Sequence, residues 1–198
     1  WPRDARSRAI AAEGLARLAR RSPDGAEAQL AVLGPALGLD ETQRGKVLYD
    51  IALWTVASYL PRSAERLAAV PPGSYDERLH EWRVREAMSR GDWPATLAAI
   101  RKMGPTQRAD SRWTYFEARM LEKTGQAAQA KPVFARAASS PTFHGFLAAD
   151  KLQQPYMLCP WKPNDSASAR AAVSRDPAIV RAMEEFFILS HCSPFSKK

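Results

Sequence analysis

Two adjacent carboxylates, Glu184 and Glu185, are the first residues that could do chemistry. Paired carboxyl groups that flank a glycosidic bond can cleave it, one as acid and the other as base or nucleophile. Adjacent residues of a helix point about 100° apart, so these two side chains do not face each other across a substrate. We therefore interpret them as part of a solvated helix surface, with paired-carboxylate catalysis as the alternative.

A single histidine near an expected helix start is the second candidate. His144 lies between Phe143 and Gly145 and could transfer a proton. A histidine in such a place more often packs or caps, and we favour that interpretation. Asp150, six residues on, fits a surface or pairing role better than that of a base.

Other catalytic and metal-binding patterns are missing from the sequence. It has no Gly-rich phosphate loop, no Gly-x-Ser-x-Gly and no His-Glu-x-x-His. His80, His144 and His191 lie far apart, with no ligand spacing around them, so we expect neither metal nor cofactor. Cys159 and Cys192 could form a disulfide, but their distance cannot be judged from the sequence.

Arginines at repeated positions could bind a ligand instead. Arg85 and Arg119 occupy equivalent places in two related helix pairs. Stacked pairs would align them along one surface, where guanidinium groups suit carboxylates or phosphates. The alternative, which we favour at this stage, is that they simply pair with Glu81 and Glu122.

Three tryptophans could stack on sugar rings. Trp82, Trp93 and Trp113 all lie at helical spacing among other apolar residues. That spacing favours packing in the core over ligand stacking.

Helix pairs must position all of these residues. Residues 112–150 have the pattern helix, turn, helix, loop, helix, with one apolar stripe and Gly125 at a helix end. The same pattern occurs 34 residues earlier. The matched positions are Trp82 with Phe116, Arg85 with Arg119, Ala87 with Leu121, Gly91 with Gly125, and Ile100 with Phe134. Such a period is typical of a tetratricopeptide-like α-solenoid.

The rest of the chain is also helical, without the alternation typical of strands. Further helices are expected over residues 3–20, 26–33, 40–60, 61–70 and 177–187, with a capping box at Asp40 and Gln43. We expect an all-α, right-handed superhelix of about nine or ten helices of typical length. Residues 1–154 form the superhelical domain. Residues 155–198 form a linker-like segment with an extended Pro-rich stretch, a mobile stretch over 166–174, a terminal helix and a frayed tail.

The charge and composition of the sequence restrict the classes of partner that the chain could bind. The net charge is +8, from 29 Lys+Arg and 21 Asp+Glu, which attracts polyanions. The basic residues are spread along helices without a block of five or six, so nucleic acid is not indicated. No window holds the roughly 18 apolar residues of a membrane span. The sequence begins at Trp1 rather than Met, so we expect it to start inside a longer precursor or to have been trimmed.

Four blocks of sequence carry a resemblance to a known family. They are Glu81-Trp82-Arg83-Val84-Arg85, Gly91-Asp92-Trp93, Arg112-Trp113-Thr114-Tyr115-Phe116-Glu117-Ala118-Arg119 and Phe143-His144-Gly145-Phe146-Leu147-Ala148-Ala149. They resemble the helical superhelix of soluble lytic murein transglycosylases. The module from Tyr156 and residues 177–187 resembles the linker region that follows the superhelix in that family.

The resemblance implies a periplasmic location and a role in peptidoglycan turnover. The family cleaves glycan strands with a single Glu in a separate lysozyme-like domain. That domain is marked by a Glu-Ser pair and by Gly-Leu-Met-Gln and Ala-Tyr-Asn-Ala-Gly blocks, none of which occurs here. We therefore expect a truncated, non-catalytic scaffold that is inactive alone, with no catalytic residue.

A binding role follows from the same resemblance. Arg85, Arg112 and Arg119 are the candidate residues for binding anionic peptide stems or glycan. The alternative function is a tetratricopeptide-type module that binds a partner protein. Self-association through an exposed end of the solenoid is a further expectation.

Overall fold

The computed structural model describes residues 2–158 and 164–191, and gives side-chain surroundings up to residue 186. The described residues form twelve α-helices, one short 3₁₀ turn and no strand. The elements are α1 Ala5–Ala19, α2 Pro23–Leu37, α3 Glu41–Ala57, α4 Ser63–Ala69, η1 Pro72–Ser74, α5 Glu77–Ser89, α6 Trp93–Arg101, α7 Pro105–Ala109, α8 Ser111–Lys123, α9 Ala127–Ala138, α10 Phe143–Leu152, α11 Ala167–Ser174 and α12 Pro177–His191. The all-α prediction is confirmed, with more helices than the nine or ten expected. None of the described helices is both long enough and apolar enough to cross a membrane.

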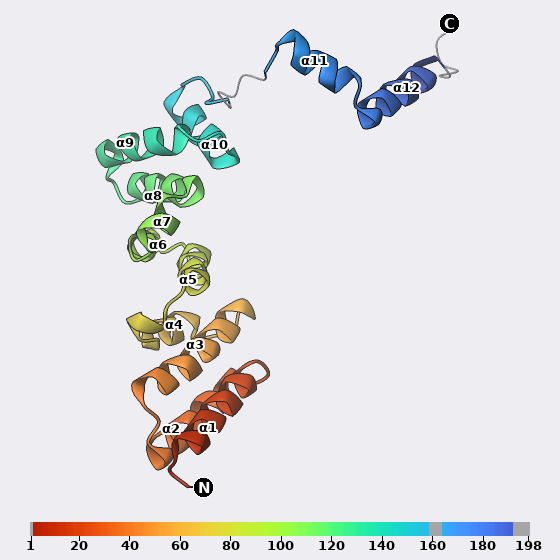
Figure 1. The fold of residues 1–198 in the computed structure, drawn as a ribbon. Helices are drawn as coiled ribbons and strands as arrows, with labels where there is room; N and C mark the ends of the chain where they lie inside the picture. Colours follow the sequence, from red (N-terminus) through yellow and green to blue (C-terminus); the bar gives the residue numbers. More distant parts are fainter. Residues whose placement is uncertain (1, 159–163, 192–198) are drawn as a thin grey trace, which may run out of the picture. The chain divides into compact units, whose positions relative to one another are not determined.

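The chain divides into two compact units, residues 1–158 and residues 159–198. In the first unit each helix packs against helices close to it in sequence (Figure 1). α1 contacts α2 and α3, α3 contacts α4 and α5, α5 contacts α6, α6 contacts α8, and α8 contacts α9 and α10. In the second unit α11 contacts α12. Local packing of this kind is what stacked helix pairs require.

Acidic and hydroxyl side chains start most of these helices. Asp40 Oδ1 accepts from the Gln43 backbone N–H at 2.8 Å, and Gln43 Oε1 accepts from the Asp40 N–H at 3.1 Å, which completes the predicted capping box. At the other helix ends, Gly91 (φ 69°) and Gly125 (φ 78°) adopt the left-handed conformation. Both follow equivalent helices, as the sequence predicted.

The two related helix pairs keep a constant offset. α5 and α8 begin at Glu77 and Ser111, and α6 and α9 begin at Trp93 and Ala127, 34 residues apart in each case. The matched apolar residues are buried in both pairs, with Ile100 0% exposed and Phe134 2% exposed. The second pair and α10 share one apolar cluster with α6.

α3 is the centre of the amino-terminal half. Val47 and Ile51 pack with α1 and α2, whereas Leu53 and Val56 pack with α4 and α5. A buried cation ties the same helices together. Arg66 on α4 is 3% exposed and donates to Thr55 Oγ1 at 2.9 Å and to Glu27 at 2.6 Å, and also pairs with Asp24.

Two segments differ from expectation. Residues 167–174 form a regular helix, α11, where a mobile stretch was expected, because Ser166 Oγ accepts from the Ala169 N–H as an N-cap. The short α7 was not predicted at all. The possible Cys159–Cys192 pair, residues 159–163 of the Pro-rich stretch and the tail from residue 192 lie outside the described residues.

Candidate binding site

The three candidate arginines lie in two ion-pair groups on α5, α8 and α10. Glu81 on α5 accepts from Arg85 at 3.2 Å and from Arg112 at 3.0 Å. Arg112 and Arg119 are seven residues apart on α8, which places them on one face of that helix. Arg119 donates to Glu122 at 2.7 Å.

Pairing with glutamates, the alternative weighed from the sequence, is therefore present. It does not neutralise the arginines. Glu81 is shared by two arginines, and Glu122 is shared by Arg119 and by Lys151 at 3.6 Å. Each group keeps one cation in excess, so the face retains positive charge toward an anionic ligand.

Aromatic rings support two of these arginines. The Arg85 guanidinium carbon lies 5.3 Å from the Trp82 ring centroid, and that of Arg112 lies 4.5 Å from the Trp113 ring centroid. Cation–π contacts of this kind hold the guanidinium group in place while leaving its edges free to bond. Of the three tryptophans considered above, Trp113 is buried, and Trp93 and Trp82 pack partly buried on the core, as favoured from the sequence.

Trp82 also lines a groove. This Trp82 groove has a volume of about 690 Å³ and lies where α3 ends, α4 begins and α5 passes. It is lined by Val56, Tyr59, Leu60, Pro61, Arg62, Ser63, Ala64, Trp82, Arg85, Glu86, Met88, Ser89 and Arg90. An aromatic wall beside several guanidinium groups suits a ring-shaped ligand that carries negative charge.

Two residues of the Trp82 groove have unusual backbone conformations. Tyr59 (φ 53°) and Arg62 (φ 68°) are in the left-handed region, which non-glycine residues seldom adopt. Tyr59 is 82% exposed and follows the end of α3, where the Leu60 N–H bonds back to the Thr55 carbonyl at 3.0 Å. Arg62 is held by Glu27 at 2.8 Å and by Glu65 at 2.7 Å.

Sequence reasoning missed Tyr59, Arg62 and Arg90 as groove residues. Tyr59 and Arg62 lie between α3 and α4, which are not part of the repeated helix pairs, and Arg90 lies at the end of α5. A tyrosine in a Tyr-Leu-Pro-Arg turn after an apolar helix was the available signal.

His144 packs among aromatic rings, as favoured from the sequence. Its ring centroid lies 5.6 Å from that of Phe116 and 5.9 Å from that of Tyr115. Burial lowers the pKa of His144 below its usual 6.5, and the nearby Arg112 lowers it further. At neutral pH the imidazole is uncharged and serves as a packing group beside Arg112. Asp150 accepts a hydrogen bond from Tyr156 at 2.7 Å, so it is a pairing residue.

One carboxylate of the first unit is deeply buried. Glu117 on α8 is 3% exposed. Both of its oxygens accept from Arg108, with the Nε bond at 3.0 Å, and Arg101 lies 3.8 Å away. A carboxylate bound on both oxygens joins α7 to α8, and its burial keeps it out of reach of a substrate.

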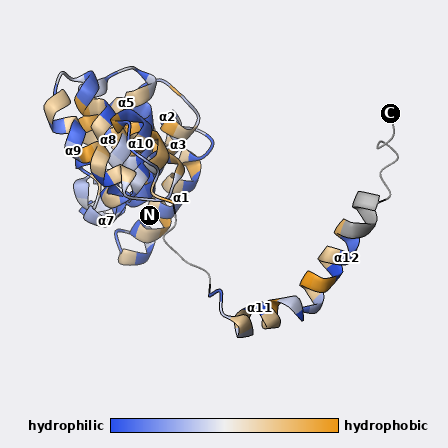
Figure 2. Ribbon diagram, turned by 90° about the horizontal axis from the view of Figure 1, so that it is seen from above, coloured by the Kyte–Doolittle hydropathy of each residue, from blue (hydrophilic) through white to orange (hydrophobic). Residues whose placement is uncertain are grey.

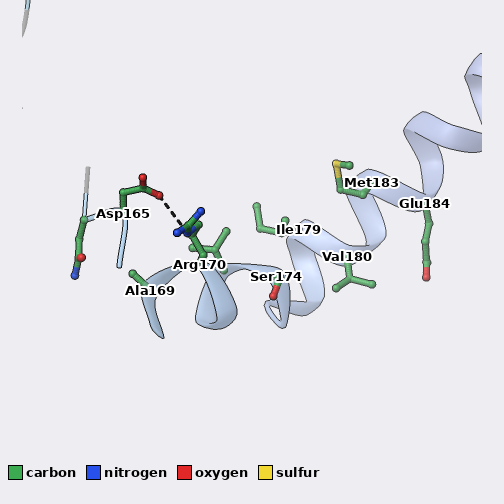
Figure 3. Close-up of a pocket in the computed structure, with 10 residues that line it drawn as sticks. Asp165, Ala169, Arg170, Ser174, Ile179, Val180, Met183 and Glu184 are labelled. Carbon is green, nitrogen blue, oxygen red and sulfur yellow. Dashed lines mark ion pairs between the residues drawn. The ribbon is translucent and has the colours of Figure 1, made fainter. Parts of the chain in front are cut away.

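The adjacent carboxylates lie in the second unit, away from any partner acid. A hollow of about 1000 Å³ between α11 and α12 is lined mainly by Val173, Ile179, Val180 and Met183. Figure 3 shows Glu184 at one end of this apolar lining, and Asp165, paired with Arg170 at 3.3 Å, at the other. Glu185 does not line it. Hydrophobic residues of α12 are visible in orange in Figure 2. Among the described residues no group of three or more potential ligands could hold a metal ion.

The helical fold and the cationic, aromatic groove define an all-helical domain with a candidate binding surface. Comparison with known proteins gives a more specific assignment. The chain is 26% identical over 181 residues to the soluble lytic murein transglycosylase of Salmonella typhimurium. It is 24% identical over 180 residues to that of Escherichia coli. Each alignment covers 90% of this chain and 27% of the relative.

Solved structures agree with these relatives. An inactive mutant of the lytic transglycosylase Slt from Pseudomonas aeruginosa matches 93% of this chain and 30% of that chain, with a TM-score of 0.72 and 30% identity. The 70 kDa soluble lytic transglycosylase of Escherichia coli matches 94% of this chain with a TM-score of 0.73 and 22% identity. The resemblance to soluble lytic murein transglycosylases is thus confirmed. The chain spans less than a third of each relative. A scan of known protein families matches none to the chain.

Proposed function

We propose that this chain is the non-catalytic helical scaffold portion of a soluble lytic murein transglycosylase, and that it binds the glycan strands of peptidoglycan in the periplasm. The similarity to Slt over 93% of the chain carries the proposal. Residues 1–154 form a right-handed, tetratricopeptide-like superhelix, and residues 155–198 form its linker segment. The constant 34-residue offset between the two helix pairs supports the superhelix.

Arg85 is the point where the arginine face meets the Trp82 groove. Its side chain is 52% exposed, lies over Trp82 and lines the groove. A sugar ring stacked on the aromatic wall would place an attached carboxylate among guanidinium groups. Arg112 and Arg119 extend the same positive face along α8, toward the anionic peptide stems.

Co-sedimentation with purified peptidoglycan sacculi tests this proposal. Binding is expected at about 0.05 M NaCl and should fall sharply at about 1 M, because the Debye length shrinks to about 3 Å. The triple variant R85Q/R112Q/R119Q should bind more weakly, by about two- to fivefold for each arginine removed.

The matched control is R17Q/K131Q/R136Q, which removes three charges from exposed positions of α1 and α9. If general positive charge alone drives binding, the two triple variants will lose affinity equally, and the assigned face is wrong. If the unaltered chain does not sediment with sacculi at low salt, the proposal itself is refuted. Circular dichroism should show the same helix content for all three proteins.

The chain alone is expected to lack lytic activity. The buried Glu117 is bound on both oxygens, and Glu184 lies at an apolar surface without a facing acid. A zymogram with cell-wall substrate should show no clearing. A cleared band that disappears in E184Q would mean that α12 carries a catalytic acid.

A protein–protein interaction module of tetratricopeptide type is the second candidate. The exposed apolar residues of α12, among them Ile179 (45% exposed) and Met183 (50% exposed), favour it. A pull-down that recovers one specific protein, together with no binding to sacculi, would favour this function over the first.

A further inference from the structure

A second cavity of the first unit adjoins the Trp82 groove, with which it shares Ala64, Glu86 and Arg90. It has a volume of about 640 Å³ and is bounded by α4, η1, α5 and α6. We call it the Tyr75 pocket. It is lined by Ala64, Leu67, Ala68, Val70, Pro72, Tyr75, His80, Arg83, Glu86, Ala87, Arg90, Ala95, Ala98, Ala99 and Lys102. Arg85, Arg112 and Arg119 do not line it.

Two cations of the Tyr75 pocket have no carboxylate partner within the described part of the chain. The Arg83 guanidinium carbon lies 3.7 Å from the Tyr75 ring centroid, and Arg83 Nε donates to the Tyr75 hydroxyl at 3.1 Å. Its other guanidinium nitrogens make no hydrogen bond there, and neither does Lys102 Nζ. The one lining carboxylate, Glu86, is held by Arg90 at 2.6 Å. The pocket therefore has excess positive charge.

A histidine adds a third unsatisfied group. The His80 ring centroid lies 4.9 Å from that of Tyr75, and His80 Nδ1 is buried without a hydrogen-bond partner. Burial lowers the pKa of His80, and the charges of Arg83 and Lys102 lower it further, against a smaller opposing effect of Asp76. Asp76 is itself occupied by the Tyr49 hydroxyl at 2.8 Å and by the Leu79 N–H at 2.8 Å. A buried polar atom without a partner is costly unless a ligand or water completes it.

The remaining walls are small and aliphatic. Alanines from α4, α5 and α6, together with Leu67 and Val70, make up most of the lining. Methyl-lined walls accept a compact apolar group and offer it no hydrogen bonds. The polar groups are thus confined to Tyr75, His80, Arg83, Lys102 and the Glu86–Arg90 pair.

We propose that the Tyr75 pocket binds a small carboxylate with an aliphatic body, such as the carboxy-terminal alanine of a short peptide. Arg83 and Lys102 hold the carboxylate beside the His80 ring, and the alanine-lined walls receive the methyl group. This site shares Ala64, Glu86 and Arg90 with the Trp82 groove, but it uses none of Arg85, Arg112 and Arg119, the arginines assigned to glycan binding. Its test is therefore separate from sedimentation with sacculi.

Nuclear magnetic resonance of the histidine side chains provides the test, on the full 198-residue chain. The probe is N-acetylalanine, and the His80 signal is assigned from its loss in H80Q. Titration should shift the His80 signal and raise the pKa of His80, because a bound anion offsets the charges of Arg83 and Lys102. The His144 signal is the internal control and should not move.

Variants locate the binding. R83Q and K102Q should each weaken N-acetylalanine binding about tenfold, as expected for loss of one charge-assisted hydrogen bond. The matched controls R136Q and K131Q remove exposed charges of α9 and should bind as the unaltered chain does. K102Q is the decisive variant if R83Q disturbs the Tyr75 packing, because Lys102 Nζ makes no bond in the described structure.

Three outcomes would overturn the proposal. The first is the absence of any His80 shift with N-acetylalanine. The second is equal binding of the neutral N-acetylalaninamide, which would show that the carboxylate is not recognised. The third is a response to inorganic phosphate that is as strong as the response to N-acetylalanine, which would show that the aliphatic walls contribute nothing.

Discussion

At the scale of single residues, capping and turn chemistry could be predicted from the sequence because it is local. The Asp40–Gln43 capping box and the left-handed Gly91 and Gly125 depend only on nearby residues. Burial of charge could not be predicted, because Arg66 and Glu117 find their partners on other helices or across a turn. Charged side chains are usually exposed, so a sequence gives no sign of the exceptions.

Gly145 shows how tertiary packing selects a residue that helix propensity disfavours. It lies in the first turn of α10, and an added Cβ would lie 1.9 Å from the Ser140 carbonyl oxygen and 3.0 Å from that of Ala137. Both oxygens belong to the backbone, so they cannot move away as the end of a flexible side chain could. The glycine permits α10 to approach the end of α9, which positions His144 against Phe116.

Replacing Gly145 therefore has a predictable cost. G145A should lower the free energy of unfolding by about 1–3 kcal/mol or more, because the backbone must shift to admit the methyl group. The matched control is G14A on the exposed side of α1, where nothing lies within 4 Å of an added Cβ. G14A should raise stability by about 0.5–1 kcal/mol through helix propensity. Urea unfolding measures both; equal effects of the two substitutions would contradict the packing argument.

At the scale of elements, the sequence predicted the helix pairs but not α7 or α11. A Gly-Pro pair such as Gly104-Pro105 is typical of a break between helices, yet Pro105 occupies the first turn of α7, where its missing N–H costs nothing. α7 then needs a tertiary contact to hold five residues in a helix. Arg108 supplies it by binding Glu117 on α8. α11 has an N-cap but no buried residue, so its sequence has low hydrophobicity and does not indicate a helix.

The Arg108–Glu117 pair should respond asymmetrically to substitution. R108A leaves the 3%-exposed Glu117 carboxylate with only the more distant Arg101, and should cost about 2–3 kcal/mol. E117Q leaves a partly exposed arginine that water can solvate, and should cost about 1 kcal/mol. The double variant R108A/E117Q should recover part of the loss of R108A. Chemical unfolding of the three variants measures this; a larger loss in E117Q than in R108A would show that the pair is not governed by the buried carboxylate.

At the scale of the whole molecule, the net charge of the sequence predicted a positive electrostatic field, but not which surface of the folded chain carries it. Positive charge is arranged around shared carboxylates, as Glu81 and Glu122 show. The grooves were beyond prediction for a different reason. Their walls come from three or four elements whose relative placement depends on packing, so Tyr59, Trp82 and Arg85 meet only in the folded chain. Family resemblance indicated the kind of fold, and the packing determined the sites.

The same charge arrangement predicts how stability depends on pH. Burial and neighbouring arginines lower the pKa of His80 and of His144 below 6.5 in the folded state. Below pH 6.5 the unfolded chain therefore binds more protons than the folded chain, and stability falls as pH falls. A second loss should begin below pH 4.5. Hydrogen bonds from Arg66 lower the pKa of Glu27, those from Lys46 lower that of Glu13 to about 2, and protonation removes these interactions.

Urea unfolding between pH 3 and pH 8 should thus give two separate declines. The double variant H80Q/H144Q should remove the upper decline and keep the lower one, because the carboxylates remain paired with arginine and lysine. K46Q, which removes a partner of Glu13 alone, is the control and should leave the upper decline unchanged. An upper decline that persists in H80Q/H144Q would show that groups other than these two buried imidazoles control stability near neutral pH, and that the cations around Tyr75 and Arg112 do not act on them as described.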